Sequence, residues 1–237
     1  MEPDLTGKTI VLTGVSRGVG LATARVLLHA GARVLGIAQD PERLAQATQE
    51  LTQSAPGRFF SLAADLSGPE FAPRVRAEAE RHFEQLDILI NNAGVMLWRD
   101  ADITAEPDGI LEQTLEVNLL APHRLLRELL PLLLRAAQPR VLNVSSGAGT
   151  HDGLKEPGIA SYRVSKWALN GLTLAQAREL AGKVAVNAFD PGWLRTDLGG
   201  PKAPGVPEDG ADGVLRTLAL PWTETGKFFK AGEEIPW

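Results

Sequence analysis

Cysteine is absent from this chain of 237 residues, and histidine occurs only four times. The lack of cysteine excludes structural disulfides, thiolate zinc sites and a cysteine nucleophile, and it fits a protein of the cytosol. His29, His82 and His123 fall on expected helices without the spacing of metal ligands. We therefore expect no catalytic metal.

An excess of charge of one sign is also missing, because 24 Lys and Arg residues stand against 29 Asp and Glu residues, for a net charge of -5. Like charges form no block, which makes nucleic acid and anionic membranes poor partners. Residues 1–8 are polar and lack the apolar core of a secretory signal, and charges interrupt every apolar run before it could span a membrane. We expect a soluble, cytoplasmic protein.

The pattern that is present is that of a layered α/β fold. Short β-branched runs alternate with longer stretches of helical period, which is typical of a parallel sheet covered by helices on both faces. We expect one doubly wound Rossmann domain over residues 1–237, with a parallel seven-stranded sheet. The expected strands are residues 9–12, 33–38, 59–63, 87–91, 141–144, 184–189 and 227–229. The expected helices include residues 19–29, 70–83, 109–137, 161–180 and 210–218.

A glycine-rich turn joins the first expected strand to the first expected helix. Glycines there let the backbone approach a pyrophosphate, whose charge the free N–H groups of the helix stabilise. A plain tight turn is the alternative, because the spacing Gly-x-x-x-Gly-x-Gly departs from the commoner Gly-x-Gly-x-x-Gly. The residues expected to hold the cofactor here are Gly14, Ser16, Arg17, Gly18, Val19 and Gly20.

The end of the second expected strand bears on the choice of cofactor. A carboxylate there would bind a ribose 2′-hydroxyl and repel a 2′-phosphate, but Ala38 and Gln39 occupy this place. Arg17 could meet the phosphate, although a solvated surface charge is the alternative, and Asp40 nearby has the wrong sign. We expect NADP(H) rather than NAD(H).

Tyr162 is the only tyrosine, and Lys166 follows it by one helical turn, so both lie on one face of an expected helix. An adjacent ammonium stabilises phenolate and lowers the pKa of a phenol from its ordinary value of about 10. Such a tyrosine could protonate an alkoxide or deprotonate an alcohol, although an ordinary amphipathic surface is the alternative. Ser146 follows another expected strand and could hydrogen-bond the substrate oxygen.

These motifs resemble, in order and over nearly the whole chain, the short single-domain branch of the short-chain dehydrogenase/reductase family. The matching segments are Thr13-Gly14-x-x-x-Gly18-x-Gly20, Asp65-Leu66, Asn91-Asn92-Ala93-Gly94, Val117-Asn118, Val144-Ser145-Ser146, Tyr162-x-x-x-Lys166, and Pro191-Gly192 with Thr196. Residues 190–197 and 225–229 look similar to carbonyl reductases of that family. One departure is Gln39, where NADP-dependent relatives often carry arginine.

The resemblance implies a role for each matching residue. Tyr162 would be the acid/base, and Lys166 would lower its pKa and hold the nicotinamide ribose. Ser146 would polarise the carbonyl, and Asn118 would anchor a proton-relaying water. The remaining cofactor contacts would be Asp65 and Leu66 at the adenine, Asn92, Ala93 and Gly94 at the ribose, and Pro191, Gly192, Trp193 and Thr196 at the carboxamide and phosphates.

The expected function is hydride transfer between NADP(H) and a ketone, an aldehyde or a secondary alcohol. The substrate pocket would be built from loops near residues 94–104, 147–161 and 192–210. Further candidates for its lining, which could equally be solvated or packed under loops, are Trp98, His151, Asp152, Leu154 and Trp193.

Other functions and assemblies stay open. One alternative is an NAD(P)-dependent epimerase or dehydratase, although such enzymes usually have a longer C-terminal substrate domain. Another is a non-catalytic NADP(H)-sensing protein, which would have no need of an acid/base. Relatives commonly pair through the helices that carry Asn118 and Tyr162, so a homodimer or homotetramer is also open.

Overall fold

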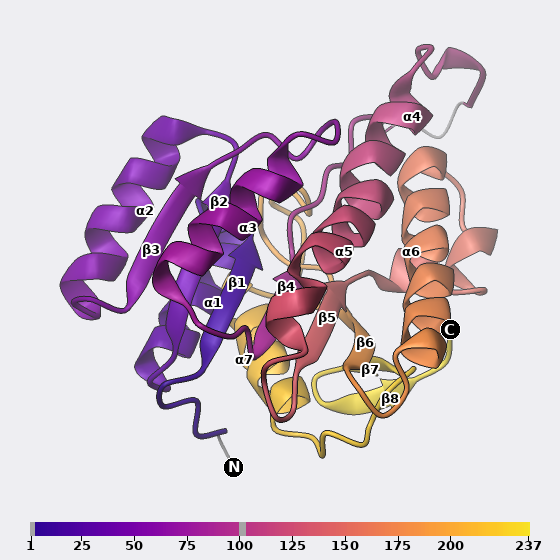
Figure 1. Cartoon of the computed structure of the whole chain (residues 1–237). Coiled ribbons are helices and arrows are strands. Elements are labelled where there is room, and N and C mark those ends of the chain that lie inside the picture. Colours follow the sequence, from indigo (N-terminus) through magenta and orange to yellow (C-terminus); the bar gives the residue numbers. More distant parts are fainter. Residues whose placement is uncertain (1–2, 100–102) are drawn as a thin grey trace.

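The structure is a computed structural model that describes residues 3–99 and 103–237. Its centre is one sheet with the strand order β3-β2-β1-β4-β5-β6-β7-β8 (Figure 1). The strands are β1 Thr9–Thr13, β2 Arg33–Ala38, β3 Phe59–Ala63, β4 Ile88–Asn91, β5 Arg140–Val144, β6 Ala185–Asp190, β7 Phe228–Lys230 and β8 Glu233–Ile235. The α-helices are α1 Gly18–His29, α2 Pro41–Ser54, α3 Phe71–His82, α4 Ile110–Leu115, α5 Ala121–Leu133, α6 Ala160–Glu179 and α7 Pro207–Leu218.

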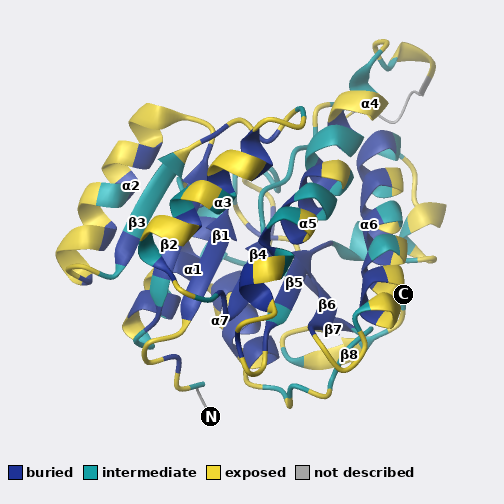
Figure 2. Cartoon of the chain, viewed as in Figure 1, coloured by how far each residue is buried: buried dark blue, intermediate teal, exposed yellow. Residues whose placement is uncertain are grey.

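Helices cover both faces of the sheet, as the sequence predicts for a doubly wound fold. Alternate residues of a strand point to opposite faces. On β1, Ile10 and Leu12 therefore join a core with α1, α2 and α7, whereas Val11 joins a second core with α3 and α5. Figure 2 shows the buried strands between these helical layers.

The predicted number of seven strands is wrong, because β8 follows β7 and pairs with it antiparallel. The turn between them consists of Ala231 at φ 52° and Gly232 at φ 86°. Such a hairpin turn is usually announced by Asn-Gly or Asp-Gly. The sequence did not predict this hairpin, because its turn begins with alanine and β8 contains two glutamates, a residue type that is uncommon in strands.

The long helix expected over residues 109–137 is interrupted. A π-helical segment, Glu116–Leu120, separates α4 from α5, and α5 ends at Leu133. The apolar pattern continues through the segment, so periodicity does not reveal the extra residue per turn. Segments of this kind frequently occur at functional sites. Here the buried residue within it is Asn118.

Within residues 3–99 and 103–237, no helix is both long enough and apolar enough to cross a bilayer.

Candidate active site

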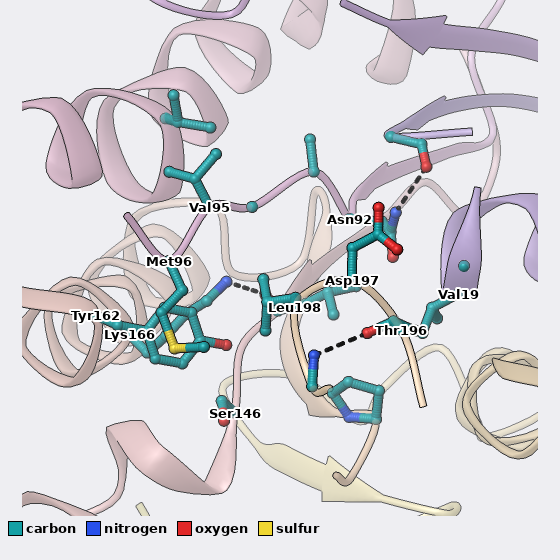
Figure 3. A pocket seen from close by; sticks show the side chains of 18 of the residues that line it. Val19, Asn92, Val95, Met96, Ser146, Tyr162, Lys166, Thr196, Asp197 and Leu198 are labelled. Atoms are coloured by element: carbon teal, nitrogen blue, oxygen red, sulfur yellow. Dashed lines mark hydrogen bonds between the residues drawn. The ribbon is translucent and has the colours of Figure 1, made fainter. Parts of the chain in front are cut away.

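A cavity of about 1470 Å³ lies at the carboxyl ends of β1, β4 and β5. The strand order reverses between β1 and β4, which is where doubly wound sheets bind ligands. All the expected site residues except Asn118 line the cavity. Figure 3 shows Ser146, Tyr162 and Lys166 at one end and Val19 and Asn92 towards the other. Part of the loop expected at residues 94–104 lies outside the described residues, which omit 100–102.

The glycine-rich turn folds tightly against the start of α1. Gly14 and Gly18 have φ values of 78° and 54°, which favour glycine. A Cβ atom on Gly20 would overlap the carbonyl oxygen of Gly14. In the described chain no side chain caps α1, whose N-cap is Arg17, and its first turn carries no acidic residue. The free N–H groups of this helix start can therefore receive an anion.

Asn92 fixes the next loop against this turn. Its Nδ2 atom donates to the carbonyl oxygen of Thr13 at 2.8 Å. The Thr13 hydroxyl accepts the N–H groups of Asn92 at 3.0 Å and Ala93 at 2.9 Å. These bonds hold the ends of β1 and β4 together at the point where a dinucleotide would cross the sheet.

At the far end of the cavity, Ala38, Gln39, Asp65 and Leu66 form the wall. The backbone N–H of Ser67 donates to Asp65 at 2.9 Å and, with smaller help from the side chains of Ser67 and Gln39, lowers the pKa of the Asp65 carboxyl. This carboxylate and the amide of Gln39 provide polar groups beside the apolar side chain of Leu66.

Two arginines gather beside Gln39, and sequence analysis found only one of them. Arg17 forms an ion pair with Asp197. Arg43, in the first turn of α2, places Nη1 3.6 Å from the same carboxylate and Nε 3.4 Å from Asp40. The Arg17 side chain is 56% exposed, so its role at a phosphate stays a prediction. A cation in the first turn of the helix after the second strand is the sequence signal that points to Arg43.

Asn118 lies behind the cavity, turned inward by the π-helical segment. Its Oδ1 accepts the N–H of Val95 and its Nδ2 donates to the carbonyl oxygen of Val95, both at 2.8 Å. Nδ2 also lies 3.0 Å from the hydroxyl of Ser165. The side-chain amide of Asn118 therefore holds the loop after β4. Because these atoms are already engaged, the proton-relaying water expected from the sequence would have to bind other atoms.

Lys166 and Tyr162 lie one turn apart on α6 and are both buried, at 3% and 8% exposure. The Lys166 ammonium lies 5.7 Å from the centre of the Tyr162 ring and donates to the carbonyl oxygen of Val144 at 2.8 Å. Gly94 leaves room for this arrangement, because a Cβ there would lie 3.4 Å from the ammonium nitrogen. The predicted pairing of phenol and cation is present.

The pKa of Tyr162 shifts in the direction opposite to the one expected. Burial raises the pKa of Tyr162 to about 12, and the charge of Asp190 acts in the same direction, while a hydrogen bond with Ser146 opposes them. Burial also lowers the pKa of Lys166 to about 8. Desolvation dominates because both side chains are buried, and the Lys166 ammonium donates to the carbonyl oxygen of Val144.

Ser146 lies two residues after β5, at the start of a short 3-10 helix, Gly147–Gly149, and its hydroxyl is held in place. The Ser146 Oγ accepts the N–H of Ala148 at 3.1 Å, which leaves its own O–H to donate. It lies at the same end of the cavity as Tyr162 (Figure 3). A carbonyl oxygen between the two hydroxyls would meet two donors.

Several expected lining residues lie elsewhere. Trp98, His151, Asp152 and Leu154 are not part of the cavity wall, and Asp152 forms an exposed ion pair with Lys155 at 2.7 Å. The side chains of His151 and Asp152 are 70% and 88% exposed, so the structure gives their expected substrate contact no support. Trp193 does line the cavity.

Other residues form the wall in their place. Ile159 precedes α6 with φ 50°, in a region that β-branched residues rarely adopt. Arg163 donates to the carbonyl oxygens of Gly153 at 2.6 Å and Gly158 at 2.9 Å, which folds the loop onto the helix. Sequence analysis missed both residues because only the folded loop brings them to the cavity.

Metal chemistry receives no support from the described residues. Within them, no group of three or more His, Asp or Glu residues is arranged to hold a metal ion.

The chain also resembles known proteins along most of its length. A 3-oxoacyl-(acyl-carrier-protein) reductase FabG of Vibrio cholerae is 32% identical over 196 residues, which cover 82% of this chain and 77% of that protein. An NADPH-dependent pterin aldehyde reductase of Arabidopsis thaliana is 31% identical over 199 residues, covering 82% and 78%. The crystal structure of an NADPH-bound carbonyl reductase from chicken fatty liver matches with a TM-score of 0.88 at 29% identity, covering 98% and 100%.

The family model for short chain dehydrogenases matches residues 8–206. It spans the glycine-rich turn, the Asn92 loop, Asn118, Ser146 and the Tyr162/Lys166 pair. The motif resemblance noted in the sequence is thereby confirmed, and this protein belongs to the short-chain dehydrogenase family.

Proposed function

We propose that this protein is an NADP(H)-dependent reductase that interconverts a ketone or aldehyde and the corresponding alcohol. The observation that carries the proposal is that Ser146, Tyr162 and Lys166 meet in one cavity with the glycine-rich turn. Relatives that are themselves named as reductases, two of them with NADPH, support it.

The residues at the cavity fit a dinucleotide with a 2′-phosphate. Gly14, Gly18 and Gly20 line the cavity without side chains, which leaves room for a pyrophosphate. Gln39 brings no negative charge, and Arg17 and Arg43 provide two cations within reach of one anion. When bound, the nicotinamide supplies or accepts the hydride. The residues proposed to hold it are Asn92, Gly94, Tyr162, Lys166, Pro191, Gly192, Trp193 and Thr196.

Tyr162 acts as the proton donor in the reduction. With a pKa of about 12, the phenol stays protonated at neutral pH. Ser146 donates its O–H to the same substrate oxygen and so stabilises the negative charge that develops there. An alkoxide is more basic than a phenolate, so the proton moves from Tyr162 to the substrate.

Lys166 and Asn118 support this step without touching the carbonyl. Lys166 has a pKa of about 8 and can return a proton to the site. Asn118 holds the Val95 backbone and thereby the wall opposite Tyr162. An epimerase or dehydratase and a non-catalytic sensor remain alternatives, with no observation in the structure that favours them.

The test is turnover of NADPH with a panel of ketones and aldehydes. We expect Tyr162→Phe to bind NADPH as the wild type does and to lose activity by roughly 10²- to 10⁴-fold, the usual contribution of a general acid. NADPH binding without oxidation across a broad panel would favour the sensor. Inversion or dehydration of a sugar nucleotide without net NADPH consumption would favour the epimerase or dehydratase.

We also propose that copies of the chain associate through α6. Val164, Trp167 and Leu174 are exposed large apolar residues, and their spacing puts them on one stripe of this helix. An apolar stripe of this kind fits a symmetric helix-to-helix contact. The cytoplasmic location and the single-domain organisation expected from the sequence likewise stay predictions.

A further inference from the structure

A buried carboxylate lies beside the reactive side chains and takes part in no step described above. Asp190 is the last residue of β6 and is 4% exposed. Its Oδ1 accepts the N–H of Gly192 at 3.0 Å, and its Oδ2 lies 3.2 Å from the ammonium of Lys230 on the adjacent strand β7. Asp190 and Lys230 both line the cavity that contains Ser146 and Tyr162.

Only glycine separates this carboxylate from the catalytic serine. Gly147 follows Ser146 directly, and a Cβ added to Gly147 would lie 3.3 Å from Oδ2 of Asp190. The charge of Asp190 therefore faces the end of the cavity where Tyr162 lies. It acts together with burial to raise the pKa of the Tyr162 phenol.

We propose that Asp190 and Lys230 form an electrostatic pair that keeps the Tyr162 phenol protonated, so that it is ready to donate a proton to a carbonyl and becomes a base for alcohol oxidation only at higher pH. The role in carbonyl reduction rests on the proposed function. The two charges do not cancel at the phenol, because the side chain of Asp190 is 5% exposed and that of Lys230 is 54% exposed. Water screens the ammonium more than the carboxylate, so the remaining field is negative.

The other charged groups near Tyr162 are engaged elsewhere or exposed. On α6, Lys166 donates to Val144. Arg163 donates to the carbonyls of the loop before the helix, and Glu106 accepts the hydroxyl of Ser161. Arg99, from the loop after β4, donates to the backbone of residues 197 and 198. Glu112 and Glu156 line the cavity as exposed side chains.

Each member of the pair has its own effect on the phenol. Asp190→Asn keeps the acceptor for the Gly192 N–H and removes the negative charge, so the pKa of Tyr162 falls. Lys230→Met removes the compensating cation, so the pKa of Tyr162 rises. Alcohol oxidation needs a phenolate, so in each variant its pH profile shifts in the same direction as the pKa of Tyr162.

The single tyrosine allows a direct measurement on the ligand-free protein. Incorporating fluorotyrosine gives one fluorine NMR signal and lowers the phenol pKa into a range where the fold survives. In Asp190→Asn we expect the phenol of residue 162 to titrate roughly one pH unit lower than in the unsubstituted protein, because one nearby negative charge is lost. In Lys230→Met we expect it to titrate at a higher pH. Asp212→Asn, which removes an exposed carboxylate paired with Arg216 on α7, is the matched control and should not move the titration.

An unchanged titration in folded Asp190→Asn, checked by circular dichroism, would overturn the proposal. If that variant does not fold, Lys230→Met decides alone, because its side chain is half exposed: a rise supports the pair, and no change overturns it. Turnover plays no part in this titration. A shifted titration in a protein that reduces no carbonyl would therefore refute the proposed function and leave the electrostatic pair standing.

Discussion

Arg17 in the glycine-rich turn forms an ion pair with Asp197, 180 positions further along the chain. The pair links the phosphate end of the cavity to the loop after β6. Arg43 also approaches this carboxylate, at 3.6 Å, so Asp197 lies between two cations. Since we propose that these cations receive the 2′-phosphate of NADPH, the Asp197 carboxylate would compete with that phosphate.

Replacing either arginine should weaken NADPH binding more than NADH binding. A hydrogen bond to a charged group contributes about 1.5–3 kcal/mol, so we expect Arg17→Ala and Arg43→Ala each to lose at least roughly tenfold in NADPH affinity. Titration of both dinucleotides measures the difference. Arg216→Ala, which loses an exposed pair on α7, serves as the control. An equal loss for NADH would mean that the arginines do not recognise the 2′-phosphate.

Removing the competing carboxylate should have the opposite effect. Exposed ion pairs contribute up to about 1 kcal/mol, so Asp197→Asn should tighten NADPH binding by roughly two- to fivefold. The gain should shrink at high salt, because screening weakens interactions between exposed charges. Calorimetry at two ionic strengths checks both statements, and weaker binding by Asp197→Asn would show that the pair supports the site.

Gly20→Ala should damage both the fold and the phosphate site. The new methyl group would overlap the Gly14 carbonyl, and overpacking of this kind costs about 1–3 kcal/mol of unfolding free energy. Gly171→Ala on α6 is the matched control, since its Cβ would meet nothing within 4 Å and the helix should gain about 0.5–1 kcal/mol. Because Gly171 lies on the apolar stripe of α6, both glycine variants are compared in the Trp167→Glu background. Urea denaturation distinguishes the two. Equal effects would contradict the packing of the turn.

Lys166 should make stability rise with pH. Its pKa falls from 10.5 in the unfolded chain to about 8 in the folded one, so the unfolded state binds more protons between these values. The free energy of unfolding should therefore increase from pH 8 to about 10, by about 3 kcal/mol at most. Tyr162, whose pKa rises from 10.0 to about 12 on folding, opposes this trend above pH 10 and reverses it above about pH 10.5. Denaturation of Lys166→Met across this range should lack the rise; an unchanged rise would exclude Lys166 as its source.

The exposed stripe on α6 predicts a change of oligomeric state. If copies associate there, Trp167→Glu should yield a monomer, because a charge on the stripe would be buried in the contact. Light scattering after size exclusion measures the mass. Leu134→Glu, at an exposed apolar position after α5, controls for lost surface hydrophobicity. A wild type that is already monomeric would refute the contact.

The features that the sequence predicts well are those with local causes. The parallel strands follow from apolar runs such as residues 88–91, and the phosphate turn from glycines between a strand and a helix. The Tyr162/Lys166 pairing follows from helical spacing. The pKa direction of Tyr162 could not follow from spacing, because it depends on burial and on Asp190, which comes from another strand.

The features that were missed depend on contacts distant in the chain or on unusual backbone. Arg43 matters because the loop after β6 brings Asp197 to it. The strand β8 can pair with β7 because Ala231 adopts a left-handed conformation, which is rare for alanine and is therefore not predicted from the sequence. Lys230 reaches Asp190 only because β6 and β7 are neighbours in the sheet.

The π-helical segment at Glu116–Leu120 ties catalytic geometry to chain length. A π-helical turn contains one residue more than an α-helical turn, so deleting one residue here would convert the segment to a regular α-helix and remove the bulge that turns Asn118 inward. The amide that clasps Val95 would then face a different direction, even though no side chain had changed. A single-codon deletion would thus release the loop after β4 without altering any of the remaining side chains.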